Sequence, residues 1–127
     1  MKVEVYCDGS ALHDRMGIGV AVFSGPTCTH KIVRRLGPGT NNQAEYRALI
    51  AALKYCLENH SEDDITVYMD SQLVVRQITG EYTVRNEALR PLKEEALSLL
   101  GSLKSVSIRW IPEKLNKAHR LAYEASH

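Results

Sequence analysis

Apolar and polar residues alternate at the start of the chain, in the pattern of a half-buried β-strand. In residues 2–8, valine, valine and cysteine occupy every second position, between glutamate, tyrosine and aspartate. Residues 17–23 and 31–36 are two further runs of β-forming residues, and the turn-forming Ser24-Gly25-Pro26 lies between them. The three runs predict an antiparallel meander of three strands.

A helix is expected after the breaker at residues 37–39. Thr40 and Gln43 have the spacing of a capping box, and the positions behind them predict a helix that runs to about Asn59. The remaining elements are predicted as a strand over 65–69, helices over 71–78 and 87–100 with Gly101 as a stop, a strand over 106–110 and a helix over 115–125. The order βββαβααβα predicts an α/β fold with one mixed sheet that has helices on its faces.

Two of the five aspartates stand where aspartate is uncommon. Asp8 and Asp70 each close a strongly apolar strand pattern, and small loop residues follow both. If the two strands are adjacent and parallel, the carboxylates meet at the carboxyl edge of the sheet, where α/β proteins collect ligands. Either aspartate alone could also be an ordinary turn or N-cap residue.

Glu45 adds a third carboxylate. It shares its side of the predicted helix with Ala48, Leu49, Ala52 and Cys56, so it lies on the stripe that faces the core. An ionised glutamate there needs compensation. The positive end of the helix dipole compensates part of the negative charge, and a cation shared with other carboxylates would compensate more of it.

Three converging carboxylates suit hard, oxygen-preferring ions, Mg²⁺ first and Mn²⁺ second. No set of histidines and cysteines has the spacing of a zinc site. Hard cations held by carboxylates at the edge of a sheet indicate phosphate chemistry, because two such ions can clamp an in-line displacement at phosphorus. The residues alone therefore predict a metal-dependent phosphodiester or phosphoryl enzyme.

Composition narrows the class of protein. The 127 residues suit a single domain, and 16 basic against 15 acidic residues argue against a globally basic nucleic-acid binder. No run is long and apolar enough for a membrane span or a signal peptide, so we expect a cytoplasmic protein without a membrane partner. Cys7, Cys28 and Cys56 lack disulfide or zinc spacing, and free thiols are expected, buried at Cys7 and Cys56.

Four segments together resemble the ribonuclease H type 1 family. They are YCDGSA at 6–11, TNNQAEYRALIAAL at 40–53, VYMDSQLVV at 67–75 and IPEKLNKAHRLAYEA at 111–125. The resemblance spans nearly the whole chain, and it implies one ribonuclease H domain over 1–127 with a five-stranded mixed sheet flanked by helices. It also implies an endonuclease that cuts the RNA strand of RNA·DNA hybrids with two Mg²⁺ ions, or with Mn²⁺ as the alternative.

The resemblance assigns roles to particular residues. Asp8, Glu45 and Asp70 would ligate the metal ions, one ion activating the attacking water and the other stabilising the departing 3′-oxygen. The positions that match substrate contacts of the family are Gly9, Ser10, Asn42 and Gln72 for the RNA strand, and Thr40 and Asn41 for the DNA phosphate. Contact with the 2′-hydroxyl is what distinguishes RNA from DNA.

The sequence departs from the family pattern at the fourth acidic motif, where His119 replaces an aspartate. We expect His119 to take the place of the fourth carboxylate as a catalytic and metal-binding residue, which would weaken Mg²⁺ binding. The alternative is a solvated histidine on the flank of the last helix. Residues 79–103 also lack the basic, tryptophan-bearing protrusion of many bacterial members.

These departures leave two other functions open. One is a nuclease with relaxed specificity that also cuts double-stranded RNA, because the elements that grip the substrate are reduced. The other is a weakened or inactive relative that only binds nucleic acid. The intact Asp8, Glu45 and Asp70 favour activity. We expect a monomer, and the initial methionine directly before the first strand favours a freestanding protein.

Overall fold

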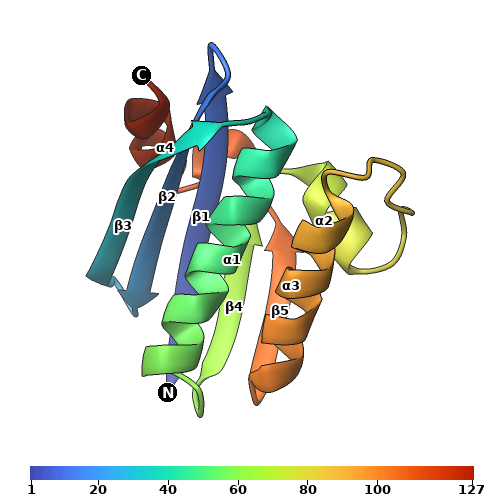
Figure 1. Ribbon diagram of the computed structural model, residues 1–127. Coiled ribbons are helices and arrows are strands. Elements are labelled where there is room, and N and C mark those ends of the chain that lie inside the picture. Colours follow the sequence, from blue (N-terminus) through green and yellow to red (C-terminus); the bar gives the residue numbers. More distant parts are fainter.

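The computed structural model describes residues 1–127, which form one five-stranded mixed sheet flanked by helices (Figure 1). The predicted α/β fold and the order of its elements are confirmed. In chain order the elements are β1 Lys2–Leu12, β2 Arg15–Ser24, β3 Thr27–Pro38, α1 Asn41–Asn59, β4 Asp64–Met69, α2 Gln72–Ile78, α3 Arg90–Ser102, β5 Ser105–Trp110, the short 3₁₀ helix η1 Glu113–Leu115, and α4 His119–Ser126.

The strands lie in the order β3-β2-β1-β4-β5, so the first and fourth strands are neighbours. β1 pairs parallel with β4 and antiparallel with β2, and β5 pairs parallel with β4. Helices α1, α2 and α3 lie on one face of the sheet, and α4 lies on the other face over β1 and β2 (Figure 1). The core fills the space between the sheet and α1, with Val5, Val20, Val67, Leu49 and Leu53 fully buried.

Helix α1 begins where the capping box predicts. The hydroxyl of Thr40 accepts a hydrogen bond from the Gln43 backbone N–H, and the Gln43 side chain accepts one from the Thr40 backbone N–H. These bonds use backbone donors that a helix start otherwise leaves without partners. Because the helix starts at Asn41, Glu45 is its fifth residue, directly after the first turn, and it faces the sheet.

Asp8 was expected to end its strand, and that expectation is wrong. Parallel pairing of β1 with β4 stops at Tyr6 and Tyr68, but antiparallel pairing with β2 continues to Leu12 and Arg15. The hydrogen bonds to β2 outweigh the low strand propensity of aspartate and glycine. Asp8 therefore lies inside β1, at the point where its parallel neighbour ends.

Two helix boundaries also differ from expectation. α3 starts at Arg90, three residues later than expected, because Pro91 fits only the first turn of a helix. It continues through Gly101 to Ser102, so Gly101 does not stop it. The last helix begins at His119 instead of 115, and a 3₁₀ turn and an extended Asn116 precede it.

Helix α4 packs closely on β2. A Cβ atom on Gly17 would lie 2.3 Å from the backbone nitrogen of Ser126, so only glycine allows this approach. Two polar contacts tie the helix to the strands: the Ser10 hydroxyl lies 2.9 Å from that of Ser126, and Arg35 Nε donates to the carbonyl of Ala125 at 3.2 Å. Helix α4 is thereby fixed against the β1–β2–β3 meander.

The remaining expectations concern cysteines and membrane spans. All three cysteines are free thiols, and Cys7 and Cys56 are buried as predicted. None of the helices combines the length and the apolar character needed to cross a bilayer.

Candidate active site

The carboxyl edge of the two central parallel strands carries a polar cleft. Asp8 points into it from β1, and Asp70 enters it directly after β4 ends at Met69. The predicted meeting of these two carboxylates is confirmed, although β1 itself runs on. The cleft is lined by Asp8, Gly9, Ser10, Asn41, Glu45, Asp70, Glu113 and His119.

Gly9 allows the first turn of α1 to lie directly against β1. A Cβ atom at this position would lie 2.1 Å from the carbonyl carbon of Ala44, well inside the van der Waals contact distance. The backbone N–H of Gly9 donates to Oε1 of Glu45 at 2.6 Å and to Oδ1 of Asp8 at 3.0 Å. One amide thus orients two carboxylates that come from different elements.

His119 lies at the site and not on a solvated flank of the helix. Its Nδ1 atom is 2.9 Å from Oδ2 of Asp8, and its Nε2 atom is 3.0 Å from Oε1 of Glu113. One potential ligand atom each from Asp8, Asp70 and His119 lie within 4.8 Å of one another. The geometry is therefore compatible with His119 in the place of the family's fourth carboxylate, and its role stays a prediction.

Electrostatics make this cluster costly unless a cation neutralises it. Burial, and then the charge of Asp70, raise the pKa of Asp8 to about 6, against the opposing effect of hydrogen bonds from Glu45 and His119. Burial raises the pKa of Glu45 well above its usual range, and Asp8 and Asp70 raise it further. Burial likewise raises the pKa of Asp70. Carboxylates with such pKa values fit a divalent cation, because a bound cation stabilises their charged forms.

Two residues of the site were not predicted from the sequence. The Asn116 side chain is buried; its Nδ2 donates to the Cys7 carbonyl at 3.0 Å and to Oδ2 of Asp70 at 3.3 Å. Asn116 stands two residues before Ala118, which was predicted on the buried stripe of the last helix. A buried amide must find hydrogen-bond partners, so this position was a weak sequence signal for a role in the site. Glu113 is exposed and carries no such signal, since only the fold brings it to His119.

The residues predicted to contact substrate surround the cleft. Gly9, Ser10 and Asn41 line it, and Oδ1 of Asn41 accepts a hydrogen bond from the backbone N–H of Ala11 at 2.7 Å. The others are outside the lining and exposed to solvent, at the starts of α1 and α2: Thr40, Asn42 and Gln72. Their contacts with nucleic acid stay predictions.

Known proteins resemble this chain over nearly its full length. A family described as "Reverse transcriptase-like" matches residues 7–125. The bifunctional protein Rv2228c of Mycobacterium tuberculosis is 34% identical over 133 residues, which cover 98% of this chain. The match covers only 35% of that relative, so the chain spans about a third of its length.

Solved structures agree in fold with this chain. RNase H1 from the halophilic archaeon Halobacterium salinarum has a TM-score of 0.92 and 36% identity, over 98% of this chain and 97% of that one. LC11-RNase H1, solved in complex with an RNA/DNA hybrid, has a TM-score of 0.88 and 29% identity, over 96% of this chain and 94% of that one. Sequence, fold and the placement of the carboxylates agree, and this chain belongs to the ribonuclease H type 1 family.

Proposed function

We propose that this chain is a metal-dependent endonuclease that hydrolyses the RNA strand of RNA·DNA hybrids. The observation that carries the proposal is the convergence of Asp8, Asp70 and His119, whose ligand atoms lie within 4.8 Å of one another beside Glu45. The substrate is supported by LC11-RNase H1, a relative of 29% identity whose structure contains an RNA/DNA hybrid.

Asp8, Glu45, Asp70 and His119 would hold two Mg²⁺ ions, with Mn²⁺ as the alternative. Bound divalent cations supply activation of the attacking water and stabilisation of the departing 3′-oxygen. His119 contributes no negative charge, so Mg²⁺ would bind more weakly than at four carboxylates, and Mn²⁺, which accepts imidazole more readily, would be favoured.

The protein itself would orient these metal ligands, through hydrogen bonds within the chain, before the substrate binds. Gly9 holds Asp8 and Glu45 through its amide, and Asn116 holds Asp70 through its side-chain nitrogen. Nδ1 of His119, 2.9 Å from Oδ2 of Asp8, orients the carboxylate, and this contact opposes protonation of Asp8. Preorganisation of this kind lowers the cost of reaching the transition state.

Substrate recognition would fall to short polar groups around the cleft. Gly9, Ser10, Asn42 and Gln72 would contact the RNA strand, where amides can reach the 2′-hydroxyl across a wide minor groove. Thr40 and Asn41 would contact the DNA phosphate near the start of α1. The Asn41 amide nitrogen is suited to this contact, because the Ala11 backbone already uses its oxygen.

The test is cleavage of a labelled RNA·DNA hybrid in Mg²⁺ and in Mn²⁺, with double-stranded RNA as the comparison substrate. We expect Asp70→Asn to lower the cleavage rate by at least roughly 10²–10³-fold, since asparagine lacks the negative charge that would hold the cations, and those cations would stabilise the transition state. The matched control is Asp64→Asn, at an exposed aspartate at the start of β4, which should retain full activity.

Three outcomes contradict the proposal in different ways. Hybrid binding without cleavage in either metal indicates the binding-only relative. Equal cleavage of double-stranded RNA indicates relaxed specificity. Full activity of Asp70→Asn removes Asp70 from the site.

A further inference from the structure

The outer edge of β3 is a long strand edge without a partner. β3 spans twelve residues, Thr27–Pro38, and pairs only with β2. Its outward backbone groups form no backbone hydrogen bonds, and α1 lies inward of it, over the middle of the sheet (Figure 1). Strand edges of this kind accept an additional extended segment, because every second residue offers an N–H and a C=O.

This edge is positively charged. No acidic residue occurs between Asp14 and Glu45, and β3 itself carries Lys31, Arg34 and Arg35. None of the three forms an ion pair; Lys31 and Arg34 form no side-chain hydrogen bond either, and Arg35 donates to the backbone of α4. β5, the other edge strand, has six residues and one cation.

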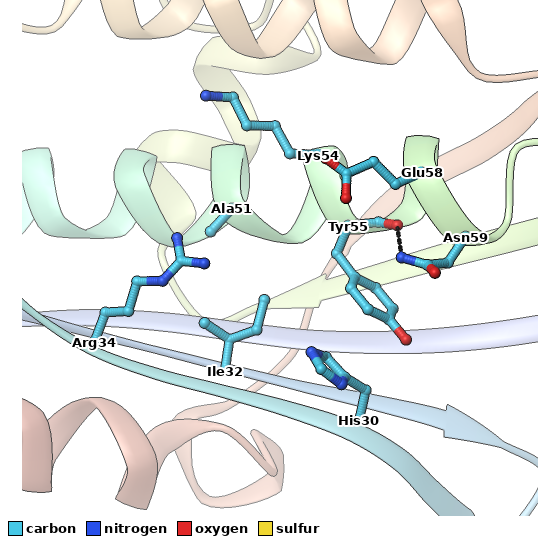
Figure 2. A pocket seen from close by; sticks show the side chains of 8 residues that line it. All are labelled: His30, Ile32, Arg34, Ala51, Lys54, Tyr55, Glu58 and Asn59. Atoms are coloured by element: carbon cyan, nitrogen blue, oxygen red, sulfur yellow. Dashed lines mark hydrogen bonds between the residues drawn. The ribbon is translucent and has the colours of Figure 1, made fainter.

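A cavity of about 380 Å³ adjoins this edge, between β3 and α1 (Figure 2). Ile32 and Ala51 form an apolar floor, and the rings of His30 and Tyr55 stack at one end with centroids 4.3 Å apart. The guanidinium of Arg34 points in from the other end (Figure 2). The lining Lys54 is paired with Glu95 of α3 at 3.3 Å, so the charged lining residues without an ion pair are Arg34 and Glu58.

We propose that β3 binds an acidic, extended peptide segment of a partner protein by strand addition. Alternate side chains of an added strand point to opposite faces of the sheet. On the α1 side they reach the cavity, whose floor suits an apolar side chain. On the other side they lie beside Lys31, Val33 and Arg35, where carboxylates meet the two cations, and Val33 is 51% exposed.

The charges argue against a second copy of this chain as the occupant. Antiparallel pairing of two β3 strands would bring Lys31, Arg34 and Arg35 of one copy close to those of the other, with no acidic residue on either strand. The apolar floor and the backbone edge favour a peptide over nucleic acid, whose phosphates use neither. Tyr55 lies ten residues beyond Glu45 on α1, roughly 15 Å along the helix, so a bound peptide leaves the active site open.

The probe is a fluorescein-labelled eight-residue peptide of alternating glutamate and valine, measured by fluorescence anisotropy on the full chain. We expect saturable binding, and no binding of the matching lysine–valine peptide. Lys31→Glu combined with Val33→Glu should weaken binding roughly tenfold or more, since both changes place negative charge on the face of β3 that the peptide carboxylates meet. The matched control Arg109→Glu, on the opposite edge strand, should bind within about twofold of the unaltered chain.

Hydrogen exchange separates strand addition from loose charge attraction. Peptide binding should slow exchange of alternate amides within Thr27–Pro38 and leave β5 amides unchanged. Absence of saturable binding, equal binding of the two peptides, or binding without protection of β3 overturns the proposal. Displacement of the peptide by a short single-stranded DNA, with loss of that DNA's binding in the double variant, assigns the edge to nucleic acid instead.

Discussion

The two halves of the active-site cleft are built differently. Asp8 and Glu45 come from a central strand and from the long helix packed on it, and they are 3% and 9% exposed. His119 and Glu113 come from an eight-residue helix and a 3₁₀ turn, and their side chains are 43% and 66% exposed. Core packing therefore encloses the side chains of the first half, whereas those of the second half lie on the exposed side of a short helix and a turn.

This difference indicates at which positions such a site tolerates a change of residue type. A carboxylate fixed by buried backbone cannot be replaced without disturbing the core. A residue on the exposed side of a short helix can change type, provided that it still reaches Asp8. In this chain the replaced position, His119, is in the second half.

The largest effect should come from forcing the two elements of the first half apart. Gly9→Ala places a Cβ atom 2.1 Å from the Ala44 backbone, so the first turn of α1 must move away from β1. We expect a loss of about 3 kcal/mol or more in the free energy of unfolding, measured by urea titration, and loss of hybrid cleavage. In the control Gly101→Ala, where the new Cβ meets nothing within 4 Å, α3 should gain up to about 1 kcal/mol. A Gly9→Ala protein of unchanged stability would show that core packing does not fix this half.

The next effect concerns charge in the first half. Because the pKa of Asp8 is raised to about 6, the metal-free folded state holds a proton that the unfolded state releases above about pH 4. The stability of the metal-free protein should therefore fall between about pH 4 and pH 7, by on the order of 2–3 kcal/mol from this group. Mg²⁺ or Mn²⁺ should restore stability at pH 7.

Thermal unfolding with and without metal at each pH measures both effects. Asp8→Asn should remove the contribution of Asp8 to the pH dependence and most of the metal stabilisation, while Glu45 and Asp70 keep their own contributions. Asp64→Asn should keep both effects. Stability that rises over the same pH interval would contradict the argument.

In the second half, removal of His119 should cost less than removal of a buried carboxylate. His119→Ala should lower the cleavage rate about tenfold, because Asp8 loses an orienting partner. His119→Asp restores a negative charge and should reduce the Mg²⁺ concentration needed for half-maximal activity. Titration of activity with Mg²⁺ measures this shift, and unchanged turnover of His119→Ala would remove His119 from the mechanism.

The smallest effect should come from Glu113. Its contact with Nε2 of His119 is solvent-exposed, and exposed pairs contribute roughly 0.5 kcal/mol or less. Glu113→Gln should therefore change the cleavage rate by no more than about twofold. Glu124→Gln, at an exposed glutamate of α4, is the control. A change above tenfold would show that the second half is held more firmly than its exposure indicates.

Local sequence signals predicted the fold better than the details of the site. The capping box at Thr40 and Gln43 was visible, because its partners are three residues apart. The continuation of β1 past Asp8 was not, since it depends on pairing with β2 across a turn. Asn116 was missed for the same reason: its partners, Cys7 and Asp70, are 109 and 46 residues away.

The close packing of α4 against Gly17 also has a consequence for the order in which the elements fold. The β1–β2–β3 meander forms from neighbouring segments, whereas the contact between Ser10 and Ser126 joins positions 116 residues apart. Contacts of such separation form late, because closing a long loop costs entropy before it gains energy. We therefore expect His119 to reach Asp8 only after the rest of the domain is in place, so the proposed nuclease would become competent for hydrolysis late in folding.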